Sequence, residues 1–267
     1  MKFYNNVLSV FILLLCIAYS CKNKKTKIPN TEKEQWVKLF NGKDLEGWTP
    51  KIKGYKYGDN HNNTFTVEEG ILKVSYKAYD SFNNTFGHLF YKSPYSNYKF
   101  RMDYRFTGEQ VAGGRPWAIR NSGIMIHCED PKNMGLKQNF PVSIEVQLLG
   151  GNSIDERSTG NLCTPGTHVV YKDSLVTEHI IKSTSKTYHS DQWVHVEIEV
   201  RNDSLIKHFI NGKEVLRYTK PHIGGKVDHN QEVWNSKVNQ PLKGGYISLQ
   251  SESHPVEFKN IEIFNLD

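Results

Sequence analysis

Hydrophobic and polar residues alternate with a period of two along much of the chain. In residues 98–106, aromatic and aliphatic side chains alternate with charged ones, a pattern typical of a strand that is buried on one face. Residues 194–200 repeat this pattern, and after a turn at Asn202-Asp203 the apolar segment 205–210 leads into Asn211-Gly212. Because both residues of Asn-Gly tolerate positive φ, this dipeptide predicts a β-hairpin.

Further short strands are predicted at intervals along the rest of the chain. Segments 64–67 and 71–74 flank the turn Glu68-Glu69-Gly70. Alternating segments also occur at 121–128, 142–148, 246–250 and 256–264, whereas no long stretch keeps a helical period. Many short strands separated by turn residues are typical of an antiparallel sandwich. We therefore predict an all-β, two-sheet antiparallel fold in one domain rather than two.

Three of these strands carry polar residues on the face that is predicted to point away from the core. The apolar residues expected to face the core are Val142, Ile144, Val146, Leu148, Ile124, Ile126, Cys128, Ile247 and Leu249. The residues expected on the opposite face are Ser143, Glu145, Gln147, Asn121, Gly123, Met125, His127, Tyr246, Ser248, Gln250 and Glu252.

This polar face has the composition of a hydrogen-bonding site. Successive residues on one face of a strand lie about 7 Å apart, so neighbouring strands would bring a carboxylate, an imidazole and several amides within the width of one sugar ring. Carboxylates and amides can hydrogen-bond to paired hydroxyl groups. A solvated surface is the alternative, but such a surface is usually rich in Lys, Glu and Thr, whereas Asn121, His127, Gln147 and Gln250 are amides and an imidazole.

The N-terminal segment has the pattern of a secretion signal. Lys2 precedes the apolar run 7–17, which is short for a membrane anchor. Cys21 follows Ser20 in an arrangement that resembles the bacterial lipobox, whose cysteine is lipidated. We predict a signal peptide over 1–20, a lipidated Cys21 with a polar tether over 21–35, and one domain over 36–267. An ordinary secretion signal is the alternative. The predicted location is the cell envelope, lipid-anchored to the outer membrane, on its periplasmic side.

The cysteine count agrees with that compartment. Of the four cysteines, Cys16 would leave with the signal and Cys21 would carry lipid, so that Cys128 and Cys163 remain. An oxidising periplasm permits a disulfide between them, and two buried thiols are the alternative.

Composition excludes two classes of protein. Aromatic residues make up 12% of the chain, which argues against a disordered protein. The 34 Lys and Arg residues are spread among 28 Asp and Glu residues without a basic stripe, so we expect no nucleic-acid partner.

Seven ordered motifs cover nearly the whole chain after residue 35. They are WVKLFNGKDLEGW at 36–48, TFTVEEGIL at 64–72, NSGI at 121–124, IEVQL at 144–148, FING at 209–212, GYISLQ at 245–250 and FKNI at 258–261. With these motifs the chain resembles the 3-keto-disaccharide hydrolase family, whose members are common as lipoproteins in Bacteroidetes-type bacteria. The resemblance implies a jelly roll of two curved sheets, similar to concanavalin-like lectins and glucanases, with the ligand on the concave sheet.

The resemblance also implies a reaction. Glycosides already oxidised at C3 would undergo 1,2-elimination and then hydration, with net release of the second sugar or aglycone. A ketone at C3 acidifies the C2 proton, so the site needs a base and a group that stabilises the enolate. Ordinary retaining hydrolysis needs two carboxyl groups about 5 Å apart. The strand that contains Glu145 offers one, although Asp103 could supply a second from another strand.

These requirements give a set of candidate residues. Glu145 is the first candidate, as the base or as a metal ligand, and the alternative is a structural carboxylate that pairs with an Arg. His127 is the second candidate, and the alternative is a histidine at the rim of the site. Asp103 and Arg105 share a strand face and are further candidates, unless they form an ordinary cross-strand ion pair. Substrate binding is assigned to Gln147, Asn121, Gln250, Arg105, His168 and Trp234. A divalent metal is a possible cofactor, and its ligands would be Glu145, His127 and His168.

Two departures from the family pattern lie beside this predicted site. The segment 111–117 has the character of an extra loop, and His127 occupies a place where many relatives carry Arg. Two other functions stay open, because a fold does not decide function. They are a non-catalytic carbohydrate-binding lipoprotein and a conventional glycoside hydrolase.

Overall fold

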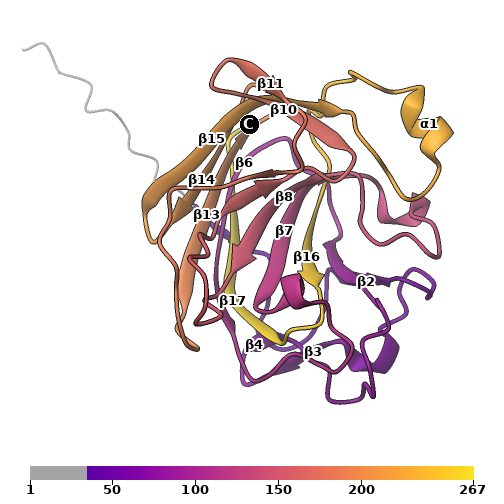
Figure 1. Cartoon of the computed structure of the whole chain (residues 1–267), viewed down its shortest axis with the longest axis vertical. Helices are drawn as coiled ribbons and strands as arrows, with labels where there is room; N and C mark the ends of the chain where they lie inside the picture. Colours follow the sequence, from indigo (N-terminus) through magenta and orange to yellow (C-terminus); the bar gives the residue numbers. More distant parts are fainter. Residues whose placement is uncertain (1–34) are drawn as a thin grey trace, which may run out of the picture. The chain divides into compact units, whose positions relative to one another are not determined.

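Two antiparallel β-sheets pack face to face in the computed structural model, which describes residues 35–267 (Figure 1). These residues form one compact unit. The predicted signal peptide, the lipidated Cys21 and nearly all of the tether lie outside the described residues. Among residues 35–267, no helix has the length and hydrophobicity needed to cross a membrane.

The larger sheet has ten strands. Nine follow the order β11-β10-β15-β14-β13-β6-β17-β4-β3, and β1 pairs with β17. Their bounds are β1 (Val37–Lys38), β3 (Phe65–Glu68), β4 (Ile71–Val74), β6 (Asn97–Phe106), β10 (Thr167–Tyr171), β11 (Ser174–Val176), β13 (Val194–Arg201), β14 (Leu205–Ile210), β15 (Lys213–Ile223) and β17 (Val256–Asn265).

The smaller sheet has seven strands in the order β12-β9-β8-β7-β16-β5-β2. Their bounds are β2 (Trp48–Ile52), β5 (Gly87–Tyr91), β7 (Asn121–Cys128), β8 (Ile144–Leu149), β9 (Asn161–Cys163), β12 (Ile180–Ile181) and β16 (Tyr246–Ser251). The helical segments are the short turns η1 (His61–Asn63), η2 (Pro116–Ala118) and η3 (Pro131–Asn133) and the helix α1 (Gln231–Asn235). The prediction of an all-β antiparallel jelly-roll sandwich is confirmed.

The core lies between the two sheets. On β6, the alternate residues Tyr98 to Phe106 are at most 2% exposed and pack in the same hydrophobic cluster as Ile124, Val146 and Leu249 of the smaller sheet. Strand β13 pairs with β14, and Asn211 and Gly212 have positive φ in the turn before β15, as the Asn-Gly signal predicts. Period-two alternation therefore gave the inward face of these strands.

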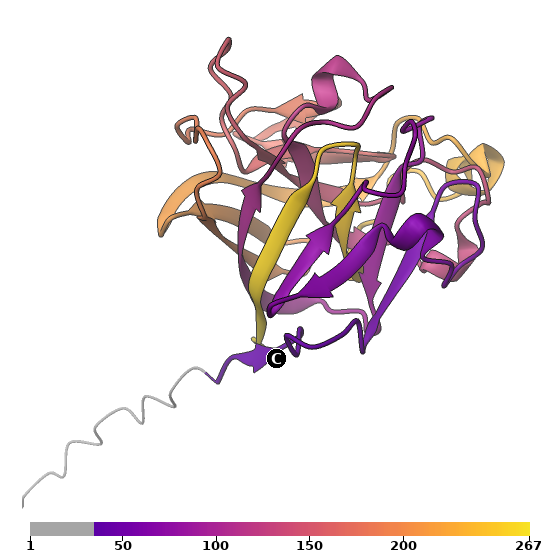
Figure 2. The same cartoon turned by 90° about the horizontal axis from the view of Figure 1, so that it is seen from below.

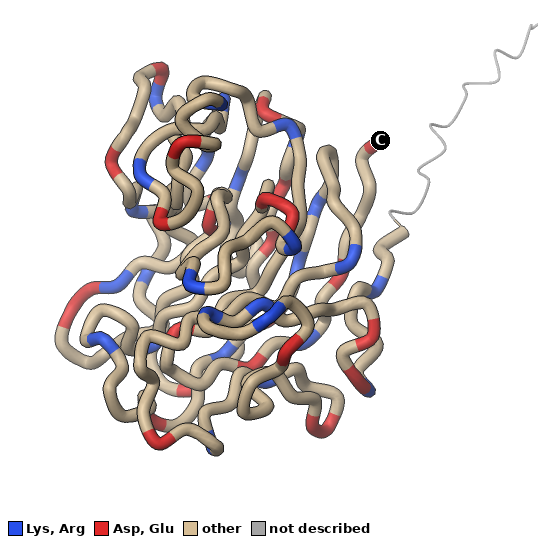
Figure 3. The backbone as a smooth tube through the Cα atoms, turned by 90° about the vertical axis from the view of Figure 1, so that its right-hand side faces the viewer, with Lys and Arg blue, Asp and Glu red and all other residues tan. Residues whose placement is uncertain are grey.

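The first and last described strands lie side by side, because Val37 of β1 pairs with Ile263 of β17 (Figure 2). Positions of Lys and Arg are interspersed with those of Asp and Glu along the backbone (Figure 3). This arrangement agrees with the diffuse charge of the sequence.

Candidate functional site

A cavity of about 350 Å³ opens on the outer face of the seven-stranded sheet, which is the face that points away from the core. Side chains from neighbouring strands line it, and loops cover it from above. We call it the Glu145 cavity. Its lining residues are Trp117, Asn121, Phe140, Glu145, Gln147, Cys163, Pro165, His179, Ile180 and Glu252.

The loop between β7 and β8 provides one wall of this cavity. The Glu129 carboxylate accepts hydrogen bonds from the Val142 N–H at 2.8 Å and from Gln138 Nε2 at 2.7 Å. These bonds tie the two ends of the loop together and place Phe140 over the sheet. As a result, Asn121, Glu145 and Glu252 are almost fully buried although they lie on an outer face.

Gly123 of the NSGI motif makes room for the Glu145 carboxyl group. Gly123 on β7 pairs with Gln147 on β8, so it lies diagonal to Glu145. A Cβ atom at position 123 would lie 2.6 Å from Glu145 Oε1 and 2.9 Å from its Cδ. The glutamate side chain therefore lies over the glycine, and any larger residue would displace it.

Glu145 and Glu252 form a buried pair of interacting carboxyl groups. Burial raises the pKa of Glu145 to about 8. Burial, and then the charge of Glu145, raise the pKa of Glu252 well above its usual value. Within residues 35–267 neither carboxyl group forms an ion pair, so Glu145 has no arginine partner there. Two such groups resist simultaneous ionisation, which makes one the natural base and the other the natural acid.

Several buried polar atoms near this pair lack a hydrogen-bond partner among the described residues. They are Asn121 Oδ1, Glu252 Oε2, both side-chain amide atoms of Gln250 and both ring nitrogens of His88. Gln250 of β16 pairs directly with His88 of β5. Buried polar groups are nearly always hydrogen-bonded, so this concentration on one sheet face marks a surface suited to a polar ligand.

An aromatic wall borders the cavity on the side of η2. Trp117 is 52% exposed. Its ring stacks on Phe86 with 6.2 Å between centroids and 9° between planes, and Phe86 contacts Phe140 at 5.0 Å. An exposed indole held flat at a cavity mouth can pack against the apolar face of a sugar ring.

The structure brings together Glu145, Gln147 and Asn121 in this cavity, and Gln250 lies on the same sheet face. Gln147 Oε1 accepts a hydrogen bond from Asn161 Nδ2 at 3.0 Å, which fixes the orientation of its amide.

His127 does not join this set, and the prediction for it was wrong. The pairing of β7 with β16 shifts between Tyr246 and Ser248, and His127 has φ of 52°. Such a β-bulge reverses the alternation beyond it. Cys128 therefore packs with Met125 on the outer face, whereas His127 Nε2 lies 3.1 Å from the Asn202 carbonyl oxygen in the β13–β14 turn. Burial lowers the pKa of His127 to about 4.

Asp103 and Arg105 also lie away from the cavity, which corrects their assignment. They point outward from β6 in the ten-stranded sheet, opposite its core-facing residues. Asp103 accepts hydrogen bonds from His195 Nδ1 at 2.7 Å and Asn260 Nδ2 at 2.6 Å, and Arg105 donates to Glu257 at 2.7 Å. Asp103 and Arg105 therefore take part in ordinary cross-strand pairs, which was the alternative interpretation of these two residues.

His168 and Trp234 lie outside the Glu145 cavity as well. His168 is on β10 of the ten-stranded sheet and lines a neighbouring cavity. Trp234 is on α1, where Lys237 lies 4.8 Å from its ring centroid. Glu145, His127 and His168 are therefore not assembled as one metal site, and residues 35–267 contain no group of three or more His, Cys, Asp or Glu that could hold a metal ion.

The proposed disulfide is not formed either. Cys128 and Cys163 are both free and buried. They lie on β7 and β9, with β8 between them. Two strand spacings amount to about 10 Å, which exceeds the reach of a disulfide.

Sequence reasoning missed Glu252, His88, Trp117 and His179 as site residues. Alternation did place Glu252 on the polar face, but the second carboxylate was expected on the strand of Glu145 or at Asp103, whereas Glu252 directly follows β16. Trp117 belongs to the extra loop at 111–117. His88 lies within a short run without alternation, so no signal distinguished its face.

Residues 35–264 match the family model of the 3-keto-alpha-glucoside-1,2-lyase-like domain. The chain belongs to this family. The match supports a carbohydrate-active function and agrees with the resemblance carried by the seven motifs. No curated protein matches the chain at a significant level.

Solved structures of similar fold include two proteins of Parabacteroides distasonis that are provisionally described as glycosyl hydrolases. The first is 21% identical with a TM-score of 0.55, covering 88% of this chain and 95% of that one. The second is 18% identical with a TM-score of 0.51, covering 87% of this chain and 100% of that one. These likenesses show a shared fold.

Proposed function

We propose that this protein cleaves 3-keto-glycosides, including 3-keto-disaccharides, by elimination across C1 and C2 followed by hydration. The observation that carries the proposal is the buried pair Glu145 and Glu252, without counter-ion among the described residues, in a cavity that suits a single ring. Its volume is near the lower end of the range for ligand pockets, which begins at about 300 Å³.

The two carboxyl groups have different roles in this proposal. Glu145, whose pKa burial raises to about 8, acts as the base that removes the C2 proton. Burial and the negative charge of ionised Glu145 raise the pKa of Glu252, so Glu252 keeps its proton and donates a hydrogen bond to the oxygen that becomes negative at C3. The electrons of the C2–H bond form the enolate, which then expels the C1 oxygen to give a 2-hydroxy-glucal with the C3 ketone restored. The leaving oxygen takes up the proton that Glu145 removed, which returns Glu145 to its ionised form. Addition of water then places a hydroxyl group at C1 and a proton at C2, which completes net hydrolysis.

The remaining groups of the face hold the sugar. Asn121 Oδ1 has no hydrogen-bond partner among the described residues and can accept a hydrogen bond from a hydroxyl group. Gln147 Nε2 has no hydrogen bond within residues 35–267 and can donate to the sugar while Gln147 Oε1 accepts from Asn161. With Trp117 at the mouth, the cavity offers hydrogen bonds at the ring edge and an apolar contact at the ring face.

A matched pair of substrates tests the proposal. The purified chain is incubated with a glucoside and with the 3-keto derivative of the same glucoside, and aglycone release is followed. We expect release from the ketone alone. Release from the unoxidised glucoside would instead establish a conventional glycoside hydrolase, and binding of both without release would establish a non-catalytic module.

The activity is expected to rise with pH. Only the ionised form of Glu145 is a base, and its pKa is about 8. The value of kcat/KM should therefore increase about tenfold per pH unit below that point and level off above it. Because burial and the charge of ionised Glu145 raise the pKa of Glu252, Glu252 should stay protonated as Glu145 ionises, and activity should decline again only once Glu252 loses its proton. The measurement is a pH–rate profile on a 3-keto-glycoside, and a profile that is flat from pH 6 to 9 would contradict the assignment of Glu145.

Replacement of Trp117 by Ala is expected to raise KM for the ketone by about three- to tenfold with little change in kcat. This range corresponds to the contribution of a stacked aromatic contact, about 0.5–1.5 kcal/mol. The Trp117→Phe variant should restore most of the affinity because it keeps a flat ring. Steady-state kinetics of both variants provide the check, and an unchanged KM in Trp117→Ala would remove Trp117 from the site.

A further inference from the structure

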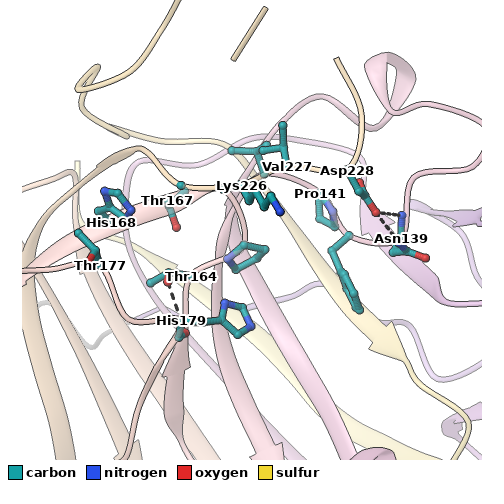
Figure 4. A pocket seen from close by; sticks show the side chains of 15 residues that line it. Asn139, Pro141, Thr164, Thr167, His168, Thr177, His179, Lys226, Val227 and Asp228 are labelled. Carbon is teal, nitrogen blue, oxygen red and sulfur yellow. Dashed lines mark hydrogen bonds between the residues drawn. The ribbon is translucent and has the colours of Figure 1, made fainter. Parts of the chain in front are cut away.

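A second cavity of about 490 Å³ adjoins the Glu145 cavity. The two share Phe140, Pro165 and His179 as lining residues, so the cavities lie next to each other on either side of these side chains. We call the second one the His168 cavity. In the close view, His168 and Thr177 lie at one end, Asn139 and Asp228 lie at the other, and His179 lies between the ends (Figure 4).

The walls of the His168 cavity are held by hydrogen bonds between distant segments. Asp228 accepts hydrogen bonds from the Asn139 N–H at 2.7 Å and from Asn139 Nδ2 at 2.5 Å. The Thr164 N–H donates to the His179 carbonyl oxygen at 3.0 Å. These bonds connect the β7–β8 loop with the segment after β15, and the end of β9 with the segment before β12.

The groups of this cavity are suited to binding rather than to proton abstraction. Its apolar surface comes from Pro141, Val142 and Val227, and its polar groups include His168, Thr177 and Lys226. Its single carboxylate, Asp228, is occupied by Asn139. An apolar surface with a few hydrogen-bonding groups is the usual composition of a small-ligand site.

We propose that the His168 cavity binds the leaving sugar of a 3-keto-disaccharide. This inference rests on the proposed function, because the oxidised ring must lie in the Glu145 cavity for its leaving group to reach the next one. The glycosidic bond joins two rings directly, so the second ring needs a site immediately beside the first. The shared residues show that the two cavities adjoin, and they place the imidazole of His179 at the boundary, where the glycosidic oxygen would lie.

A blocking substitution tests the proposal. Thr177 is exposed at the end of the cavity, so Thr177→Trp should fill the space without disturbing the core. We measure kcat/KM for a 3-keto-disaccharide and for methyl 3-ketoglucoside of the same anomer. The ratio of the two values should fall by about tenfold or more in Thr177→Trp, and by less in Lys226→Ala. The matched control Lys213→Ala, at the exposed β14–β15 turn, should leave the ratio unchanged.

Binding of the unoxidised disaccharide and of methyl glucoside is measured in parallel by calorimetry. Thr177→Trp should weaken binding of the disaccharide alone. An unchanged ratio together with unchanged disaccharide binding would overturn the subsite. If the wild-type chain cleaves neither ketone, the proposed chemistry fails, and the binding measurements still decide whether this cavity holds a second sugar. Thermal melting of each variant confirms that it is folded.

Discussion

Replacing Glu145 with Gln is expected to lower kcat for a 3-keto-glycoside by about 10²- to 10⁴-fold, the usual contribution of a general base. Gln has nearly the same shape and can fill the same space over Gly123. It cannot accept the C2 proton, however, so substrate should still bind while turnover is lost. Kinetics on the ketone and calorimetric binding of the unoxidised glucoside separate these two effects.

The same substitution is expected to stabilise the protein at alkaline pH. The folded-state pKa of Glu145 is raised from 4.5 to about 8, so the folded state holds a proton that the unfolded state loses. The stability contributed by Glu145 is therefore complete below about pH 4.5 and is lost as pH rises to about 8. Because Gln does not ionise, Glu145→Gln should melt progressively higher than wild type over this interval, by about 2–4 °C for each kcal/mol.

Glu199 provides a matched control. It is also largely buried, on the outer face of β13. Burial acts to raise its pKa, but hydrogen bonds from Arg201 and Lys207 outweigh that effect and lower it. Glu199→Gln should therefore lower stability at neutral pH and leave turnover intact. Full activity in Glu145→Gln, or equal loss in both variants, would show that Glu145 is not the base.

Gly123→Ala is expected to reduce turnover by about 10²-fold while every proposed catalytic group remains present. The new methyl group would lie 2.6 Å from Glu145 Oε1 and 2.8 Å from its Cγ, so the carboxyl group must move. A displacement of about 1 Å at a reacting group is enough for a loss of this size. The measurement is kcat for a 3-keto-glycoside.

A double-mutant cycle isolates the steric cause of that loss. In wild type, Gly123→Ala should lower the melting temperature because it forces Glu145 aside. In a Glu145→Ala background the same change should cost little, since the carboxyl group is gone, and the difference between the two backgrounds measures the contact. Equal destabilisation in both backgrounds would mean that position 123 acts through the β7 backbone and not through Glu145.

Burying two carboxyl groups without a counter-ion among the described residues costs free energy of folding, and such a cost is consistent with a functional site. When a buried polar group has hydrogen-bond partners, replacing it by a neutral group of the same shape usually destabilises the protein, because the partners are left unpaired. A buried group without such partners does not stabilise the fold in this way. Glu145 and Glu252 have no counter-ion among the described residues, burial raises the pKa of both, and the charge of Glu145 raises that of Glu252 further. Sites that are tuned for proton transfer commonly store such unfavourable interactions.

The sequence alone determined the strands that alternate clearly, most of their core-facing residues and the polar face that carries Glu145. Period-two alternation is a local property, because successive side chains of any strand point to opposite sides. It therefore gave β6, β13 and β8 and placed Glu145, Gln147 and Asn121 together. The same property says nothing about which of two outer faces a polar residue reaches, and so Asp103 on β6 was assigned to a site that lies on the other sheet.

The tertiary structure decided the rest. The bulge that turns His127 inward depends on how β7 pairs with β16, which are more than a hundred residues apart in the chain. The position of Glu252 beside Glu145, the space left by Gly123 and the approach of Trp117 likewise depend on strand order and loop packing. These are contacts between distant segments, and alternation within one segment cannot encode them.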